Sequence, residues 1–212
     1  MRSSMPVLGA LLAAGSLAVA GAAVASPEMF GAGWAAVLAL LVVRLVLARP
    51  RRSGSRLLVP AALLGLAFAV LLKFRVLAAR SSWTEPKPVA DILAMSGDPA
   101  RWRAEAMGEL AGAGFAVLAC AAAGLAILRL REPASRAAVI GLVGLVVATG
   151  IHVETAIRSW QAVPDPAPAR GTIYSAANEV VSTMDTRGAV VTAMMLAGAC
   201  LIVIGSTSRR PA

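Results

Sequence analysis

Long uncharged, apolar stretches alternate with short basic turns and longer polar segments along this chain. Residues 112–128 and 137–151, for example, contain no charged side chain, and eight residues that include three arginines separate them. An apolar run of roughly 20 residues can cross a bilayer as a helix, which satisfies its own backbone hydrogen bonds there. The pattern therefore predicts an all-α, polytopic integral membrane helical bundle with six transmembrane helices.

The first 25 residues can be interpreted in two ways. Ala23-Val24-Ala25 before Ser26 resembles a signal-peptidase site, which would leave five transmembrane helices. The apolar run is instead long for a signal peptide, which favours a retained first transmembrane helix. Its small residues Ala10, Ala14, Ala18 and Ala22 recur at every fourth position, so that another helix can pack closely against them.

The remaining chain divides into two hairpins, two loops and a last helix. In order, we expect helical hairpin 1 at 26–80, an extracytoplasmic loop with a short interfacial helix at 81–106, helical hairpin 2 at 107–158, a second extracytoplasmic loop at 159–186, the last transmembrane helix at 187–206 and a cytoplasmic tail at 207–212. Pro88 can start the interfacial helix, and Asp98-Pro99 is a typical helix start before hairpin 2. Ser175 or Asp185 can cap the last helix.

The two hairpins resemble each other in sequence. Residues 31–35 and 112–116 match at a shift of 81, and Trp83 matches Trp160 at a shift of 77. Small deletions in one copy of a tandem two-helix repeat would produce such a drift. An Ala-, Leu-, Gly- and Val-rich chain also matches itself by chance, so both explanations remain open.

Composition and charge support a membrane protein rather than a soluble one. The mean hydropathy is +0.78, and 58% of the residues are hydrophobic while only 15% are charged. The net charge of +9 does not indicate nucleic-acid binding, because the basic residues cluster at the ends of apolar stretches. Four arginines lie in 49–56, three in 129–136 and two in 209–210. Such clusters stay in the cytoplasm, so we expect a multi-pass protein of a bacterial inner membrane with both termini cytoplasmic.

The sequence offers little chemistry inside the bilayer. It has no HExxH or GxSxG motif, and its single histidine cannot supply a metal site or a bis-histidine haem site. Cys120 and Cys200 lie in apolar stretches without CxxC spacing and are expected to be small core residues. We therefore expect no cofactor and no metal, and an enzyme is the less favoured of the function classes.

One group of charged residues is expected to meet at the extracytoplasmic side. Lys73 and Arg75 precede His152 and Glu154 by 79 positions, close to the shift of the repeat. The start of hairpin 2 adds two acidic residues, and the candidate binding residues are Lys73, Arg75, Glu105, Glu109, His152 and Glu154. The alternative is ordinary interfacial charge, with Glu154 paired to Arg158 one turn on. The expected interfacial anchors are Trp83, Trp102, Trp160 and Tyr174.

Two function classes follow from these observations. The first is a non-catalytic membrane subunit or assembly protein that meets a membrane protein partner, or a second copy of itself, through this polar face. The second is a small permease or channel-like carrier for a small or apolar solute, which would need a polar path or broken helices near the midplane. Only a few polar side chains, such as Thr149 and Thr192, lie in the middle of the apolar stretches.

Overall fold

Helices are the only secondary-structure elements in the described part of the computed structural model, which contains no strands. It covers residues 5–24, 26–48, 53–84, 99–128, 135–161 and 170–207. The helices are α1 (Met5–Ala23), α2 (Pro27–Ala48), α3 (Ser53–Thr84), α5 (Pro99–Leu128), α6 (Arg136–Gln161) and α7 (Arg170–Thr207). Within these residues five helices are long and apolar enough to span a membrane, whereas the apolar part of α1, Val7–Ala23, is shorter. The predicted all-α membrane bundle is confirmed.

Helix boundaries depart from the prediction mainly at the two expected loops. α3 continues to Thr84 and α5 begins at Pro99, as Asp98-Pro99 indicated, so only part of the 81–106 segment is not helical. α7 already begins at Arg170, which makes 170–186 helical and places Ser175 and Asp185 inside the helix instead of at its start. Hydropathy marks where an apolar span ends, but a polar sequence can continue the same helix into water. The interfacial helix expected from Pro88 lies outside the described residues.

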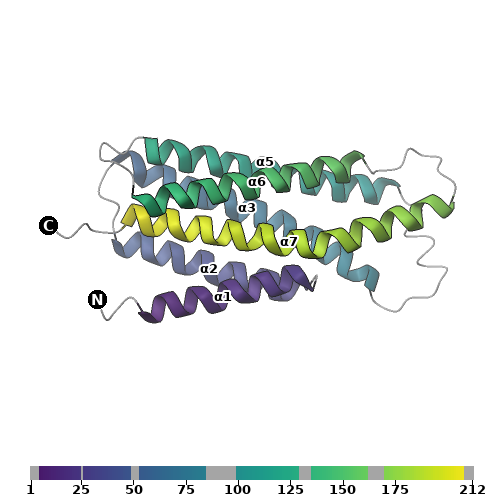
Figure 1. Ribbon diagram of the computed structural model, residues 1–212, viewed down its shortest axis with the longest axis horizontal. Coiled ribbons are helices and arrows are strands. Elements are labelled where there is room, and N and C mark those ends of the chain that lie inside the picture. Colours follow the sequence, from purple (N-terminus) through teal and green to yellow (C-terminus); the bar gives the residue numbers. More distant parts are fainter. Residues whose placement is uncertain are drawn as a thin grey trace.

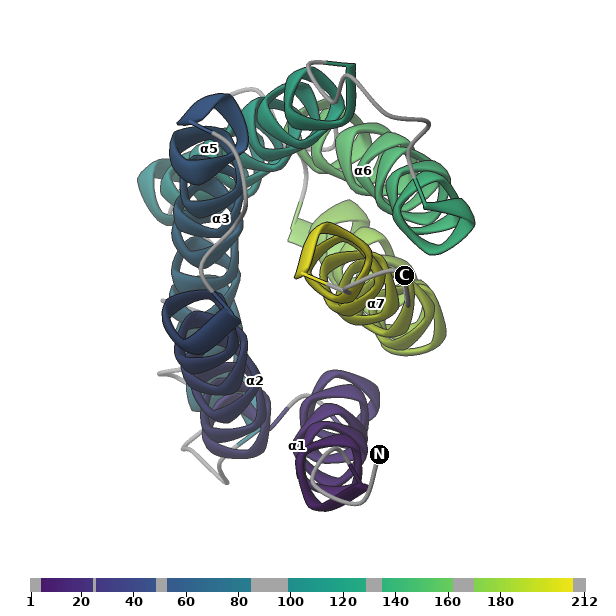
Figure 2. The ribbon, with the colours of Figure 1, turned by 90° about the vertical axis from the view of Figure 1, so that its left-hand side faces the viewer.

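The helices run alternately up and down and form two layers. We call the end where α3 ends and α5 begins the distal end, and the end where α1 begins and α7 ends the proximal end (Figure 1). Viewed along the bundle, α2, α3 and α5 form one layer and α1, α7 and α6 the other (Figure 2). The most extensive contacts join the pairs α3–α5, α6–α7 and α1–α2.

Glycines let two of these pairs approach backbone to backbone. A Cβ atom added to Gly141 of α6 would lie 2.8 Å from the carbonyl oxygen of Gly198 on α7, and the reverse distance is also 2.8 Å. A Cβ on Gly33 of α2 would meet the backbone nitrogen of Ala18 on α1. Ala18 itself is fully buried, so this part of the predicted small-residue stripe does pack against another helix.

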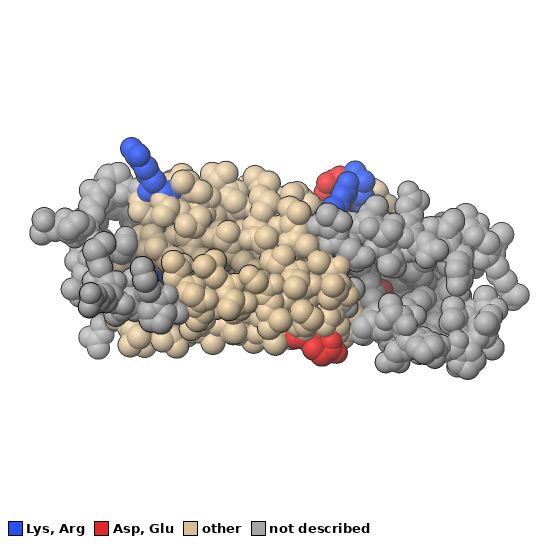
Figure 3. All heavy atoms as spheres, turned by 60° about the horizontal axis from the view of Figure 1, so that its bottom comes forward, with Lys and Arg blue, Asp and Glu red and all other residues tan. Residues whose placement is uncertain are grey.

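The surface between the two ends is apolar. Figure 3 shows a broad belt without Lys, Arg, Asp or Glu on one face, with charged side chains near its two ends. Large side chains such as Leu118 and Ile140 are each 62% exposed there, as expected where lipid replaces water. In the interior, Val37, Leu41 and Val203 are fully buried and fill the space between the layers.

Candidate ligand-binding site

Buried polar side chains gather in the distal part of the bundle. Among the described residues, the buried polar or charged ones are Glu105, Glu109, Thr149, His152 and Thr192. All five lie on α5, α6 and α7, and each lies in the half of its membrane span that is nearer the distal end. A polar group inside a membrane span is costly unless it has a partner or a function, so this concentration marks a candidate site.

An ion pair between α3 and α5 is the centre of this group. Lys73 Nζ lies 2.7 Å from Glu109 Oε1, a distance typical of a charge-assisted hydrogen bond. The Glu109 side chain is 0% exposed and the Lys73 side chain 20% exposed. The two charges therefore largely compensate each other inside the bundle, where neither is hydrated as it would be in water.

His152 of α6 completes a cluster of three ionisable groups. Its Nδ1 atom lies 4.0 Å from Glu109 Oε2, which is too far for a hydrogen bond but close enough for an electrostatic interaction. A Cβ atom on Gly112 would lie 3.5 Å from His152 Nε2, so the imidazole ring packs closely against the backbone of α5. We call Lys73, Glu109 and His152 the buried triad.

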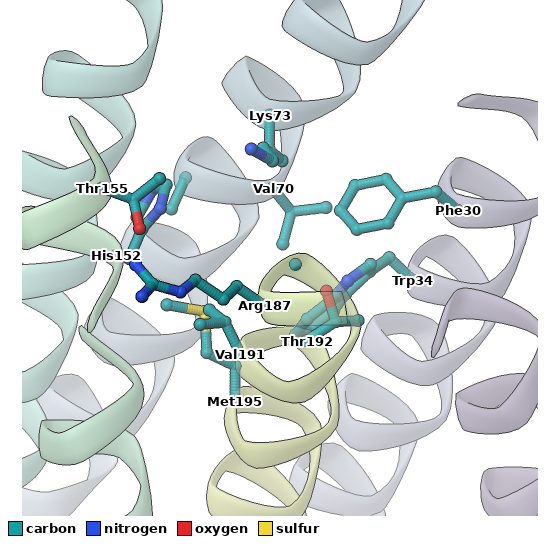
Figure 4. Close-up of a pocket in the computed structure, with 12 residues that line it drawn as sticks. Phe30, Trp34, Val70, Lys73, His152, Thr155, Arg187, Val191, Thr192 and Met195 are labelled. Carbon is teal, nitrogen blue, oxygen red and sulfur yellow. The ribbon is translucent and has the colours of Figure 1, made fainter. Parts of the chain in front are cut away.

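A small cavity lies beside the buried triad, between the two helix layers. Its volume is about 50 Å³, and α2, α3, α6 and α7 all contribute to its wall. Figure 4 shows these side chains converging on the cavity from the four helices. The polar lining residues are Trp34, Lys73, His152, Thr155, Arg187 and Thr192, and the apolar ones include Phe30, Val70, Val191 and Met195. We call this cavity the polar pocket.

Trp34 places a polar atom in this wall without an internal partner. The residue is 1% exposed, and its indole Nε1 has no hydrogen-bond partner among the described residues. Its ring packs edge-on against Phe30 with a centroid distance of 6.5 Å. A buried indole N–H normally donates a hydrogen bond, so an acceptor in the pocket would satisfy it.

The structure brings together only part of the predicted group. Lys73, Glu109 and His152 meet in the buried triad, and Glu105 is buried one turn before Glu109. Arg75 is exposed instead. Glu154 is also outside the triad, because its side chain is 50% exposed and lies 2.5 Å from Arg158. This last pair is the ordinary interfacial interaction that the sequence had also suggested.

Of the four expected interfacial anchors, only Trp160 has a side chain among the described ones. Trp160 is 44% exposed near the distal end of α6. Trp83, Trp102 and Tyr174 lie in α3, α5 and α7, but their side chains lie outside the described ones.

The sequence did not identify four polar residues of the pocket as site residues: Trp34, Thr155, Arg187 and Thr192. Trp34 carried a usable signal, since tryptophan prefers the membrane interface and here lies well inside an apolar span. Arg187 was predicted to be the first residue of the last transmembrane helix, and nothing in the sequence showed that its side chain would extend toward α6.

The described residues do not contain three His, Cys, Asp or Glu side chains placed to hold a metal ion. No protein-family model, curated protein or solved structure matches this chain. The geometry of the polar pocket is therefore the basis for a functional assignment.

Proposed function

We propose that this chain is a non-catalytic membrane protein that holds a small solute in the polar pocket, as a permease of the carrier type does. The observation that carries the proposal is the Lys73–Glu109 ion pair inside the membrane spans, whose lysine lines a cavity. Ionisable side chains are rare in such spans and usually belong to a ligand, ion or proton site. An apolar core of the same volume would avoid the desolvation of both charges, so stability alone does not explain them.

The burial of the triad favours a solute over a protein partner as its ligand. The side chains of Lys73, His152 and Glu109 are 20%, 9% and 0% exposed, respectively. A protein surface that docks on the bundle from outside would reach little of these groups. A small molecule in the pocket would touch Lys73 and His152 directly.

A carrier must also open toward the proximal end. In this conformation the buried apolar side chains of Val37, Leu41, Leu66 and Val203 lie between the pocket and the proximal end. This arrangement supports a pocket that is accessible from one side at a time, which alternating access requires. If vesicles that contain the reconstituted protein accumulate the bound solute, the protein transports that solute in addition to binding it.

We place the protein in a bacterial inner membrane with the distal end outside. The arginine-rich segments 49–56, 129–136 and 209–210 support this orientation, because in sequence they adjoin or closely follow the proximal ends of α2, α5 and α7, at Ala48, Leu128 and Thr207.

Native mass spectrometry of the protein, purified in lipid nanodiscs without added ligand, tests the proposed function. We expect the native chain to retain a small molecule. We expect Val191→Phe, which fills the pocket from α7, to lose it, while Val143→Phe at a 58% exposed, lipid-facing position retains it. A native chain without any bound molecule, or one still bound in Val191→Phe, would contradict the proposal.

The second candidate is a subunit of a larger membrane complex. It is favoured by Arg75, Glu154 and Arg158, which are exposed at the distal end and accessible to a partner. Mild-detergent purification followed by mass spectrometry should then recover a stoichiometric partner, and Glu154→Gln should weaken its binding. A solitary particle would leave only the pocket function.

A further inference from the structure

The polar pocket is rich in hydrogen-bond donors. Lys73 and Arg187 line it as cations, and Trp34 adds an indole N–H that can only donate. No aspartate or glutamate is among the described residues of its wall. Glu109 binds Lys73 without itself lining the pocket, so among the described lining residues no acidic side chain matches the charge of Arg187. Such a wall selects a ligand that accepts hydrogen bonds and carries negative charge.

The unpartnered indole of Trp34 points to the same ligand chemistry independently of charge. Trp34 is only 1% exposed, and it lines the cavity. Leaving a buried donor unpaired is unfavourable, and an oxygen atom of a ligand would remove this cost. Carboxylate and phosphate oxygens accept several such hydrogen bonds at once.

The size of the pocket limits what it can hold. A volume of about 50 Å³ corresponds to a few water-sized spheres at roughly 10–15 Å³ each. This is room for a carboxylate or phosphate group but not for a long apolar chain. A larger ligand must therefore continue outside the polar pocket.

A second hollow next to Arg187 provides that continuation. It has a volume of about 310 Å³ and is lined by Ile151 and Glu154 of α6 and by Arg187 and Val190 of α7. Arg187 thus borders both spaces, and Figure 4 shows its side chain extended from α7 toward α6. The Glu154 carboxylate pairs with Arg158, and the apolar side chains of Ile151 and Val190 can contact a hydrocarbon chain. We call this second hollow the α6–α7 cleft.

We propose that the ligand is an acidic amphiphile whose oxyanion head occupies the polar pocket and whose chain leaves through the α6–α7 cleft. Arg187 and Lys73 bind the head, and Trp34 donates a hydrogen bond to it. Because the α6–α7 cleft lies between the membrane spans of these two helices, the amphiphile reaches the pocket laterally from the lipid. This inference rests on the proposed function and specifies its solute.

Tryptophan fluorescence in lipid nanodiscs tests the inference. Replacing Trp83, Trp102 and Trp160 by Phe leaves Trp34 as the only tryptophan of the chain. Laurate is the probe, with dodecanol as the uncharged chain and acetate and inorganic phosphate as oxyanions without a chain. We expect laurate to change the Trp34 emission saturably and dodecanol to bind at least about tenfold more weakly, since it lacks the charge-assisted hydrogen bonds.

Two arginine variants give the matched comparison. Arg187→Gln should weaken laurate binding about tenfold or more, because the hydrogen bonds it removes are to a charged group. Arg75→Gln, which removes an equal charge from an exposed side chain that lines neither the polar pocket nor the α6–α7 cleft, should change it less than about twofold. Thermal stabilisation of the unmodified chain by laurate, absent in Trp34→Phe, provides the same test if the triple Phe background folds poorly.

The outcomes separate the ligand class from the proposed function. Equal binding of laurate and dodecanol, or equal effects of the two arginine variants, would overturn the inference. If acetate or phosphate bound as tightly as laurate, the polar pocket would still be an oxyanion site. Its ligand would then not be an amphiphile that comes from the lipid. If no probe binds while the native chain carries a molecule that Val191→Phe loses, the acidic amphiphile is wrong and the proposed function stands.

Discussion

The Lys73–Glu109 pair makes a quantitative prediction for stability. In Lys73→Met the Glu109 carboxylate, which is 0% exposed, loses the cation bound at 2.7 Å. Removing one partner of a buried ion pair costs about 3–5 kcal/mol. We expect a value near 3 kcal/mol here, because Lys73 is itself 20% exposed and His152 Nδ1 stays 4.0 Å from the carboxylate. The measurement is reversible unfolding in mixed micelles, followed by circular dichroism.

A double-mutant cycle separates the ion pair from other effects of the substitution. Lys73→Met combined with Glu109→Gln removes both charges and should recover most of the lost stability, since close pairs couple by roughly 0.5–3 kcal/mol. Arg75→Met is the matched control, because Arg75 lies on the same helix and is exposed, and its loss should stay within about 0.5 kcal/mol. A Lys73→Met chain as stable as the native one, or additive effects in the cycle, would refute the reasoning.

Three further predictions concern packing and topology. Gly141→Ala should destabilise the bundle by about 1–3 kcal/mol, because the added methyl group meets the α7 backbone. Gly150→Ala, where no atom lies within 4 Å, should be neutral or stabilising by up to about 1 kcal/mol. The melting temperatures of the two variants and the native chain test this difference. The N-terminal 25 residues should be retained, since Ala18 and Ala22 of α1 are buried in the bundle, and an intact mass lacking them would contradict this. A C-terminal green fluorescent protein fusion should fluoresce while an alkaline phosphatase fusion stays inactive; the reverse would invert the proposed orientation.

The fold could be predicted because each span carries its own signal. Uncharged stretches between arginine clusters identified the helices one at a time, without any knowledge of their neighbours. The extension of α7 back to Arg170 could not be predicted in this way, since a polar segment has no hydropathy signal that separates helix from loop. A glycine such as Gly141 allows another helix to approach closely, but the sequence does not identify Gly198 as its partner, because that depends on the relative position of two helices.

The candidate site was predicted in part for a similar reason. Lys73 and His152 were linked through the shift of the repeat, and Glu109 through its place at the start of hairpin 2. Which charges turn inward depends on the rotation of each helix, and residues two apart on a helix point in different directions. Lys73 and His152 therefore reach the pocket while Arg75 and Glu154 do not. Trp34 lies in the matching segment 31–35, but its counterpart Phe115 carries no polar atom, and Arg187 lies outside both hairpins, so the repeat indicated neither residue.

The pairing of the helices has a consequence for motion. Backbone-to-backbone glycine contacts hold α6 to α7 and α1 to α2, while α3 packs most extensively on α5, so each pair moves most easily as a unit. Trp34, Lys73 and Arg187 belong to three different pairs. A molecule that contacts all three side chains would hold these units together. The free energy for separating one pair from the rest would rise by RT ln(1 + L/Kd), where L is the free concentration of that molecule. Occupancy of a cavity this small would then slow hydrogen exchange across the whole bundle.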